Sequence, residues 1–334
     1  MRAIGYTTPG PFEVLEEFDL DRPVPAGHDL LVEVAAVSVN PVDDKTRAGR
    51  PPLTDGPAVL GWDAVGVVAE VGEQCDRFGP GDRVWYAGDY TRQGSNAEFH
   101  LVDERIVGRA PSTVTDAEAA ALPLTALTAW EGLFDRLQVD EPIEGAGPAV
   151  VVIGGAGGVG SIAIQLLRAR TDYTVIATAS RPETRAWVTD LGAHHVIDHR
   201  QPLPGQIDAL GLGQPGFVFS TTHTRDYLAA IAEFMSPQGR FGFIDRFTDF
   251  DVSLFFPKCI SIHPELMFTR SMQRTADIAR QGAILDELAG LVDGGQVRST
   301  MTESFGPITA DNLRRAHARI ATGAVLGKIV LEGF

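Results

Sequence analysis

The chain has 334 residues, of which 44% are hydrophobic and 22% are charged, and its formal net charge at pH 7 is −16. This length allows two domains with separate cores, and the acidic balance argues against a broad nucleic-acid-binding surface. No apolar run is long enough to span a membrane, and the N-terminal residues lack the charged and apolar regions of a signal peptide. The two cysteines, Cys75 and Cys259, are too few for a disulfide framework. We therefore expect a cytoplasmic protein with no nucleic-acid or membrane partner.

Short β-like runs separated by glycine and proline fill roughly the first 110 residues, beginning with a strand at the N-terminus. The clearest runs after it are residues 30–40, 64–72, 82–88 and 97–103. Such spacing predicts an antiparallel, barrel-like β domain. From Asp116 the pattern becomes helical, and Asp116 is the candidate N-cap of that helical segment.

Strand-like and helix-like segments then alternate, which predicts a parallel sheet with helices on its faces. The expected strands are 149–153, 173–179, 194–198, 217–222 and 240–245, and the expected helices are 158–170, 183–191 and 225–235. The part from about residue 265 returns to helix and ends in the strand-like run GKIVLEGF. We therefore expect a β-rich domain made of residues 1–123 and 265–334, interrupted by a nucleotide-binding domain at 124–264.

Residues 149–167 carry the most informative motif, in which an apolar run, a glycine-rich turn and a helix-like segment follow one another. Gly155, Gly157 and Gly160 fit the G-x-G-x-x-G spacing of dinucleotide-binding folds. In such loops the first glycine permits a tight turn, the second lets the backbone approach a pyrophosphate, and the third allows close packing of helix on strand. The amides that begin the following helix face the phosphates. The predicted cofactor contacts of this loop are Gly155, Ala156, Gly157, Gly158, Val159 and Gly160.

The end of the next predicted strand, 173–179, indicates which dinucleotide is bound. An NAD site normally carries an Asp or Glu about 20 residues beyond the glycines, where it binds the ribose hydroxyls. Here the strand is followed by Ser180 and Arg181, and the first carboxylate is Glu183. A carboxylate would repel a 2′-phosphate, whereas a serine hydroxyl and a guanidinium bind one, and Arg185 would add a second cation. The sequence therefore predicts NADPH as the cofactor.

The order of these motifs resembles the medium-chain dehydrogenase/reductase superfamily over essentially the whole chain. The resemblance is carried by residues 38–49, 60–72, 81–85, 122–130, 156–160 and 327–331. Within the superfamily the chain is most similar to the zinc-free quinone oxidoreductase branch, and especially to bacterial proteins described as zinc-type alcohol dehydrogenase-like, whose hallmarks include WYAGD and MFTRSM. The resemblance implies an α/β protein with a GroES-like β-rich catalytic domain and a Rossmann domain with a doubly wound parallel sheet. It also implies a homodimer formed through the nucleotide-binding domain.

The resemblance raises the question of zinc, which members with a catalytic ion hold through a Cys, a G-H-E motif and a later Cys or Glu. This chain has Asn40 at the first position, the tripeptide GWD at 61–63 in place of G-H-E, and Leu124 or Thr125 near the third ligand. Tryptophan is not a zinc ligand, because zinc binds deprotonated nitrogen, sulfur or oxygen donors. The short segment 88–96 contains no cysteine and replaces the cysteine-rich lobe of zinc members. We therefore predict no bound zinc.

Without a metal to polarise a carbonyl, hydride transfer suits a quinone or an α,β-unsaturated carbonyl, which spreads the developing negative charge over a conjugated oxygen. Asn40 is the first candidate donor to that oxygen, because it stands at a metal-ligand position. Asp43 and Lys45 follow in the same loop, and Lys45 would donate to the oxyanion or supply a proton. The structural alternatives are a turn shaped by Asn before Pro and a solvated charged loop.

The remaining candidates concern substrate stacking and further cofactor contacts. Trp62, Tyr86 and Phe268 are candidates for an aromatic wall against a planar substrate, with core packing as the alternative. The family positions imply additional cofactor contacts at Thr128, Thr222, Phe243, Ile244, Asp245 and Lys328.

The sequence thus predicts an NADPH-dependent, zinc-independent oxidoreductase that delivers hydride to a quinone or an α,β-unsaturated carbonyl. Two alternatives remain open, a zinc-type alcohol dehydrogenase acting on alcohols or aldehydes and a non-catalytic NADPH-binding protein. Metal analysis distinguishes the first alternative, and binding of NADPH without turnover distinguishes the second.

Overall fold

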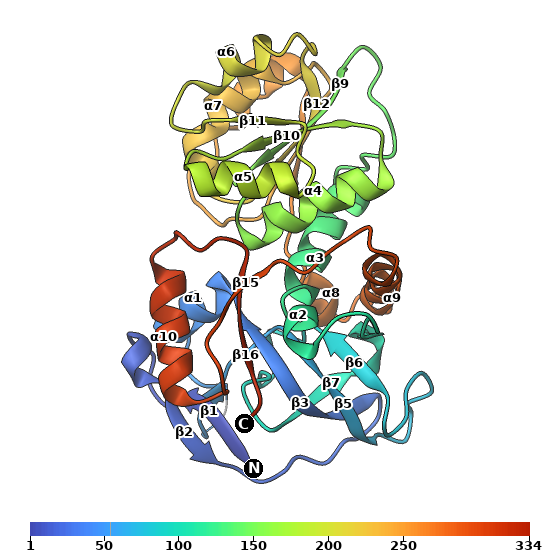
Figure 1. Cartoon of the computed structure of the whole chain (residues 1–334), viewed down its shortest axis with the longest axis vertical. Coiled ribbons are helices and arrows are strands. Elements are labelled where there is room, and N and C mark those ends of the chain that lie inside the picture. Colours follow the sequence, from blue (N-terminus) through green and yellow to red (C-terminus); the bar gives the residue numbers. More distant parts are fainter. Residues whose placement is uncertain (54) are drawn as a thin grey trace. The chain divides into compact units, whose positions relative to one another are not determined.

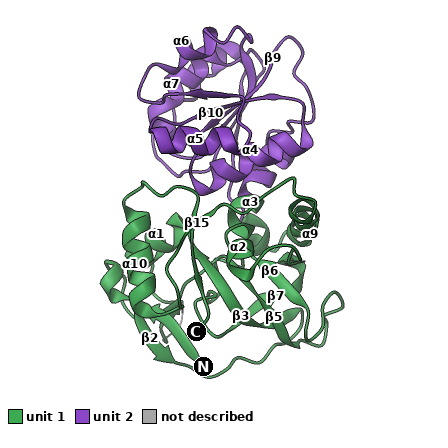
Figure 2. Ribbon diagram, in the orientation of Figure 1, with its two compact units in different colours: residues 1–127, 268–334 green, residues 128–267 purple. Residues whose placement is uncertain are grey.

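A computed structural model describes residues 1–53 and 55–334 and divides the chain into two compact units (Figure 1, Figure 2). Unit 1 comprises Met1–Leu127 and Phe268–Phe334, and unit 2 comprises Thr128–Met267. The two unit boundaries fall four and three residues beyond the domain boundaries expected at 123/124 and 264/265. In the described ranges, no helix is long and apolar enough to cross a membrane.

Unit 1 is a mainly antiparallel β domain. Its larger sheet has the order β15-β16-β3-β5-β6-β8, with β7 also paired to β3, and its smaller sheet has the order β2-β1-β4. The strands are β1 (Arg2–Tyr6), β2 (Glu16–Asp19), β3 (Asp29–Val39), β4 (Ala58–Val59), β5 (Ala64–Val71), β6 (Arg83–Tyr86), β7 (Phe99–Asp103), β8 (Val107–Arg109), β15 (Met301–Ser304) and β16 (Lys328–Glu332). The helices are η1 (Phe12–Val14), α1 (Pro41–Gly49), η2 (Glu104–Ile106), α2 (Asp116–Ala120), α8 (Thr269–Gln273), α9 (Arg280–Asp293) and α10 (Ala310–Ala321), and α3 (Pro123–Trp130) runs across the boundary into unit 2.

The long strand β3 positions the polar centre of unit 1. It pairs with β5, β7 and β16, and two irregularities in its register with β5 allow the sheet to bend. The antiparallel register of β16 on β3 pairs Ile329 with Val39. This register brings Lys328, near the end of the chain, beside Asn40.

Unit 2 is a parallel six-stranded sheet with the order β11-β10-β9-β12-β13-β14. Its strands are β9 (Gly147–Ile153), β10 (Thr174–Thr178), β11 (His195–Ile197), β12 (Pro215–Ser220), β13 (Arg240–Phe243) and β14 (Ser261–Pro264). Its helices are η3 (Glu131–Arg136), α4 (Gly158–Arg170), α5 (Pro182–Asp190), α6 (Leu203–Asp208), α7 (Thr224–Phe234), η4 (Val252–Leu254) and η5 (Phe256–Lys258). Figure 1 shows α4 and α5 on one face of this sheet and α6 and α7 on the other. The strand order reverses between β9 and β12, which is where ligands bind in doubly wound folds. The predicted fold class, a GroES-like β domain with a Rossmann domain, is confirmed.

The segment after Asn40 is a helix, whereas the sequence predicted a loop. Pro41 occupies the first helical position, where its missing N–H would be unpaired in any case. The Asp43 carboxylate accepts a 2.7 Å hydrogen bond from the Asn40 backbone N–H. Asp43 therefore closes the start of α1, so the charged cluster is not the solvated loop considered as its alternative.

The helical segment after residue 115 also starts and divides differently from its prediction. Thr115 is the N-cap, because its hydroxyl accepts from the Glu118 N–H at 3.2 Å and Glu118 accepts from the Thr115 N–H at 2.9 Å. Asp116 is the first helical residue instead of the cap. Pro123 has no N–H to donate, and the chain forms two helices, α2 and α3, on either side of this break.

Candidate functional site

The glycine loop between β9 and α4 is shaped by four glycines. Gly154 has a φ of +80°, and a Cβ there would lie 2.5 Å from Thr221 Oγ1. Gly154 therefore makes the left-handed turn that the sequence assigned to Gly155. Gly155 is a packing glycine, since its Cβ would lie 3.0 Å from Ala177 Cβ. Gly154 directly precedes the motif in the sequence, and its presence there could have indicated that it makes the turn.

The second and third glycines of the motif have different surroundings. A Cβ on Gly160 would lie 2.3 Å from the Gly154 carbonyl oxygen, so α4 approaches the loop as closely as a glycine permits. A Cβ on Gly157 would meet nothing nearer than 3.6 Å. Gly157 therefore borders open space, which is the surrounding expected for a glycine that faces a pyrophosphate.

The backbone amides of the loop point to an anion at the start of α4. The Gly154 N–H donates to Thr178 Oγ1 at 2.9 Å, and the Gly155 N–H donates to the Thr178 carbonyl at 3.2 Å. The N–H groups of Gly158, Val159 and Gly160 have no backbone acceptor in the described ranges. No acidic residue stands in the first turn of α4. These amides and the helix dipole suit a phosphate.

The cations beyond β10 differ in part from the predicted set. Arg181 is partly exposed and pairs with Glu183 at 3.0 Å. Arg185 donates to the carbonyls of Ala179 at 3.2 Å and Val196 at 3.0 Å, so its guanidinium ties α5 to the ends of β10 and β11. Arg185 therefore has a structural role here, and its predicted contact with the 2′-phosphate stays a prediction.

A second arginine does lie at this edge of the sheet. Arg200, just beyond β11, donates to the Ser180 carbonyl at 2.9 Å and pairs with Asp198 at 2.8 Å. Its side chain is 62% exposed, which leaves it accessible to a ligand. Sequence reasoning missed Arg200 because it follows the next strand, β11, and the segment VIDHR at the end of that strand was the available signal.

The predicted contacts at the ends of β12 and β13 have local partners of their own. Asp245 accepts from the Thr224 N–H at 2.9 Å and from the Thr224 hydroxyl, so it caps the start of α7. The predicted contact of Asp245 with the cofactor stays a prediction beside this capping role. Thr222 Oγ1 lies 2.7 Å from His223 Nδ1, and the Ile244 N–H donates to the Ser220 carbonyl at 3.3 Å.

Two further predicted cofactor contacts of unit 2, Phe243 and Thr128, are packed against other parts of the protein. The Phe243 ring packs against three other phenylalanines, with centroid distances of 5.4 Å to Phe247, 5.6 Å to Phe241 and 5.7 Å to Phe250. Thr128 is buried in α3. The structure thus places Thr222, Phe243 and Ile244 at the carboxyl edge of the sheet, where their predicted contacts with the cofactor stay predictions.

Lys328 lies at the centre of a buried polar network in unit 1. Its ammonium lies 2.8 Å from Asp63 Oδ2 and also donates to Asn40 Oδ1 and to the Val39 carbonyl, the latter at 3.4 Å. An ammonium has three N–H donors, so these partners use all of them. Lys328 is therefore an internal cation of unit 1, and its expected contact with the cofactor stays a prediction.

The side chains of Asn40 and Asp63 also make their hydrogen bonds within this network. The Asn40 amide donates to Asp63 Oδ2 at 2.8 Å and to the Ser38 carbonyl at 3.4 Å, while its oxygen accepts from Lys328. Asp63 Oδ1 accepts from the Leu124 N–H at 2.7 Å. Burial raises the pKa of the Asp63 carboxyl, and the Lys328 ammonium opposes that rise. Asn40 is thus a buried connector, which corrects its expected role as a free donor to substrate.

Asp43 and Lys45 lie on opposite sides of α1. Asp43 is buried, and burial raises the pKa of its carboxyl to about 7 against the opposing effects of the Asn40 amide and the Lys328 ammonium. Lys45 is exposed. The structure therefore brings Asp43 close to the Asn40 network and leaves Lys45 outside it.

The positions equivalent to zinc ligands do not fit zinc. Asn40 and Asp63 are joined by an ammonium, and the Trp62 indole donates to the Asp89 carbonyl at 3.3 Å. Amide and indole groups do not supply the deprotonated donors of a tetrahedral zinc site. Within residues 1–53 and 55–334, no group of three or more His, Cys, Asp or Glu side chains could hold a metal ion.

Two of the three predicted wall residues meet, and a third aromatic residue joins them. The Trp62 ring centroid lies 5.2 Å from that of Tyr90 and 6.0 Å from that of Phe268, and Tyr90 lies 5.4 Å from Phe268. We call these three residues the aromatic cluster. Tyr86 instead stacks on His100 at 5.4 Å and hydrogen-bonds to its Nδ1 at 3.0 Å, which corrects its assignment to the wall. Tyr90 was overlooked because it lies in the short segment 88–96.

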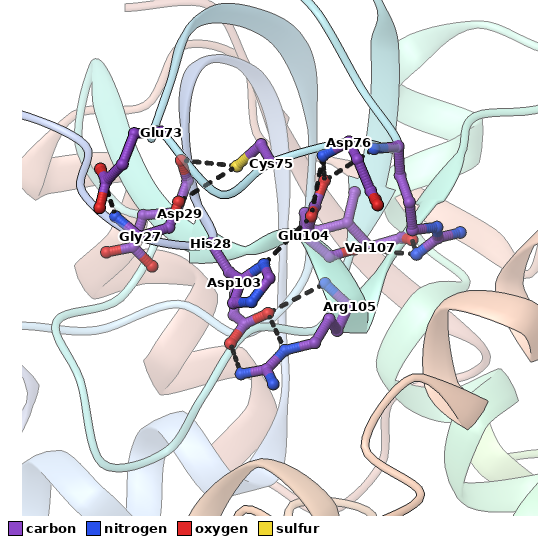
Figure 3. Close-up of polar contacts among 11 residues, drawn as sticks. Gly27, His28, Asp29, Glu73, Cys75, Asp76, Asp103, Glu104, Arg105 and Val107 are labelled. Carbon is purple, nitrogen blue, oxygen red and sulfur yellow. Dashed lines mark hydrogen bonds and ion pairs between the residues drawn. The ribbon is translucent and has the colours of Figure 1, made fainter.

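A separate network around Glu104, shown in Figure 3, is structural. The buried Glu104 carboxylate accepts from the backbone N–H groups of Asp76 at 3.1 Å and Arg77 at 3.0 Å, and lies 3.3 Å from His28 Nδ1. The Cys75 thiol donates to the Asp29 carbonyl at 3.4 Å, and burial raises its pKa to about 11. A thiol held protonated in this way is neither a nucleophile nor a metal ligand.

The comparisons with known proteins agree with this architecture. Residues 26–124 match the alcohol dehydrogenase GroES-like domain, and residues 158–276 match the zinc-binding dehydrogenase family. A Staphylococcus aureus zinc-type alcohol dehydrogenase-like protein is 38% identical, covering 99% of this chain and all of its own. A tomato 2-methylene-furan-3-one reductase is 29% identical, covering 99% of this chain and 79% of its own.

Solved structures are similar over their full length. A Rhizobium etli protein described as a zinc-dependent alcohol dehydrogenase has 57% identity and a TM-score of 0.98, covering 100% of this chain and 98% of its own. The quinone oxidoreductase of Coxiella burnetii has 25% identity and a TM-score of 0.82, covering 100% of this chain and 99% of its own. Full-length identity of this degree, with both domain types present, makes this chain an oxidoreductase of the medium-chain dehydrogenase/reductase superfamily.

Proposed function

We propose that this protein is an NADPH-dependent, zinc-independent oxidoreductase that delivers hydride to a quinone or an α,β-unsaturated carbonyl. The observation that carries the proposal is the Lys328 ammonium, which joins Asn40 and Asp63 in the region where the family resemblance places zinc ligands. Conjugated acceptors need no metal, because they spread the developing charge themselves. A furanone reductase and a quinone oxidoreductase among the similar proteins support this substrate class.

The cofactor supplies the hydride, and the chain supplies its binding site. The free amides at the start of α4 and the open face of Gly157 suit the pyrophosphate. Ser180, Arg181 and Arg200 suit the 2′-phosphate of NADPH, because a guanidinium binds phosphate through paired N–H donors. The carboxylates that follow β10 and β11, Glu183 and Asp198, both pair with arginines, so neither is left free for a ribose 2′-hydroxyl.

We expect the wild-type protein to use NADPH in preference to NADH, and the preference to fall when Arg181 or Arg200 is changed to Gln. Each lost charged hydrogen bond to phosphate weakens the binding free energy by about 1.5–3 kcal/mol. Because about 1.4 kcal/mol corresponds to a ten-fold change in affinity, KM for NADPH should rise roughly 10- to 100-fold. KM for NADH should stay within about two-fold, because NADH has no 2′-phosphate. Steady-state kinetics with both cofactors measure this, with Arg168→Gln as a control because Arg168 pairs with His194. Equal use of the two cofactors by the wild type would contradict the proposed site.

The substrate class is tested with the unmodified protein. NADPH oxidation is followed with 9,10-phenanthrenequinone, an enone and a panel of simple aldehydes, before and after dialysis against a chelator. Turnover of the quinone and the enone that survives chelation supports the proposal. Activity that is confined to alcohols or aldehydes and lost with the chelator would replace it with the zinc-dependent alternative, and NADPH binding without any turnover would replace it with a non-catalytic role.

We further propose that the protein is a cytoplasmic homodimer formed through unit 2. Cys75 and Cys259 are both free thiols, which suits a reducing compartment. Strand β14 ends the six-stranded sheet, and an edge strand presents unpaired backbone groups to a partner. Four exposed apolar side chains flank it in the sequence, namely Val252, Leu254, Phe256 and Leu266. Antiparallel pairing of β14 with its copy across a two-fold axis would cover this face.

Phe256→Asp is expected to convert the dimer to a monomer. Phe256 is 80% exposed in the single chain, and burial of a phenylalanine contributes about 1.5–3 kcal/mol. Because the change occurs twice in a symmetric dimer, Kd should rise roughly 100-fold or more. Sedimentation velocity over a concentration series measures it, with Val24→Asp as the matched control, since Val24 is 79% exposed in unit 1. A Phe256→Asp protein that sediments like the wild type would refute this interface.

A further inference from the structure

Arg50 packs on the aromatic cluster, in which Tyr90 is half-exposed like Arg50 itself and Trp62 and Phe268 are buried. The guanidinium carbon of Arg50 lies 4.3 Å from the Tyr90 ring centroid and 5.6 Å from that of Trp62. Arg50 Nη1 donates to the Tyr90 carbonyl at 2.6 Å, and Tyr6 Oη donates to the Arg50 carbonyl at 2.7 Å. The end of α1 and the segment 88–96 therefore hold one guanidinium over the Tyr90 ring and near the Trp62 ring.

Both residues retain donors that this packing does not use. Of the three guanidinium nitrogens of Arg50, Nη1 has an acceptor, Nε is buried and unpartnered, and Nη2 has no hydrogen-bond partner in the described part of the chain, which leaves Nη2 as its available donor. Tyr90 Oη accepts from Thr46 Oγ1 at 3.3 Å, which leaves the phenolic proton available to a further acceptor. Arg50 forms no ion pair with a carboxylate of residues 1–53 and 55–334, and its contacts are with Tyr6, Tyr90 and Trp62.

The other candidate donors of unit 1 are unsuited to this role. The amide of Asn40 and the ammonium of Lys328 are fully used within the buried network. Lys45 is exposed on α1 and contributes to neither cluster. Arg50 and Tyr90 thus combine aromatic surface with unsatisfied donors, and that combination is what a planar molecule with a carbonyl oxygen requires.

We propose that Arg50 and Tyr90 bind the carbonyl oxygen of the conjugated substrate and stabilise the negative charge that it acquires. This assignment rests on the proposed hydride transfer. The hydride forms a new bond to a conjugated carbon of the acceptor, and the displaced π electrons move onto the carbonyl oxygen to give an enolate. A proton from solvent water then completes the reduction. The net change consumes acceptor, NADPH and one proton and yields reduced acceptor and NADP⁺. Arg50 and Tyr90 stay protonated throughout and act only through hydrogen bonds and charge.

Arginine suits this position for a physical reason. Its charge is delocalised over a planar group that can stack on a ring and donate from its edge at the same time. A hydrogen-bond donor that already faces the oxygen does not have to reorient when negative charge develops there. Loss of one such donor lowers kcat by about 10²–10³-fold in enzymes where it has been measured. We expect the Arg50 and Tyr90 contributions to lie at or below that range, since two donors share one oxygen.

The test compares Tyr90→Phe and Arg50→Lys with the wild type, using NADPH and 9,10-phenanthrenequinone. Tyr90→Phe keeps the ring contacts and removes only the hydroxyl, and Arg50→Lys keeps the charge and removes the planar fork. We expect kcat to fall about 10- to 100-fold in each, a loss at or below that of a single oxyanion donor, while KM for NADPH and the melting temperature stay near wild-type values. Arg50→Ala should lose more activity and recover part of it in millimolar guanidinium chloride, a rescue that a purely structural role would not produce.

The matched control is Arg22→Met, because the Arg22 guanidinium lies 4.2 Å from the Phe99 ring centroid elsewhere in unit 1. It should leave kcat unchanged. If Tyr90→Phe and Arg50→Lys both turn over the quinone within two-fold of the wild type, this inference is wrong while the proposed function stands. If the wild type reduces no quinone or enone, both the proposed function and this inference are wrong. The activity of the wild type therefore distinguishes the two failures.

Discussion

Lys328→Met is expected to lower the free energy of unfolding by about 3–5 kcal/mol, which is the typical cost of removing one partner from a buried ion pair. Lys328 and Asp63 are almost fully buried, and their charged atoms lie 2.8 Å apart. Methionine preserves most of the side-chain volume but leaves the Asp63 carboxylate without a counter-ion. It also leaves Asn40 Oδ1 without its donor. The decrease in the free energy of unfolding therefore comes from buried polar groups that lose their partners, with little contribution from a cavity.

Chemical denaturation of the wild type, Lys328→Met and the double variant Lys328→Met/Asp63→Asn measures this effect. The double variant should recover a large part of the loss, because a neutral amide can still accept from the Leu124 N–H without carrying a buried charge. Lys45→Met is the matched control on the exposed side of α1, and it should change stability by no more than about 0.5 kcal/mol. A single variant that unfolds at the wild-type denaturant concentration would show that Asp63 does not depend on this ammonium.

Gly160→Ala and Gly157→Ala are expected to separate folding from cofactor binding. Alanine at 160 would place its Cβ 2.3 Å from the Gly154 carbonyl and 2.7 Å from Gly155 Cα, so the start of α4 must move. Such overpacking costs about 1–3 kcal/mol of stability. Because the same amides are proposed to face the pyrophosphate, affinity for NADPH should be lost as well.

Gly157→Ala should behave in the opposite way. The residue has a φ of −75°, which alanine adopts freely, and a Cβ there would meet nothing within 3.6 Å. Stability should therefore change by no more than about 1 kcal/mol, the scale of an N-cap substitution. A pyrophosphate against this glycine would meet the new methyl group, so KM for NADPH should rise at least ten-fold.

Melting curves and NADPH titrations of both glycine variants provide the measurements. The pattern expected is reduced stability with reduced binding for Gly160→Ala, and near wild-type stability with reduced binding for Gly157→Ala. If Gly157→Ala bound NADPH as the wild type does, the pyrophosphate would have to lie elsewhere on the loop.

The local patterns of the chain were sufficient for its fold and superfamily. Alternation of strand and helix periods after residue 149 predicted the parallel sheet, and the spacing of Gly155, Gly157 and Gly160 predicted the turn that feeds α4. These features depend on neighbours within a few residues, so they can be read along the chain. The same locality explains the errors at Thr115 and Gly154, where the residue just outside the recognised pattern performs the function.

Which buried polar groups meet was decided by the tertiary structure alone. Lys328 reaches Asn40 across 288 positions of sequence because β16 pairs with β3 in one register. Arg200 reaches Ser180 because β11 follows β10 in the sheet. A charged side chain looks the same in the sequence whether it is solvated or paired in the interior, and only the packing that excludes water determines its partner. The sequence therefore determined that this is an oxidoreductase with a nicotinamide-cofactor-binding fold, and the packing of strands decided that an internal ammonium joins Asn40 and Asp63.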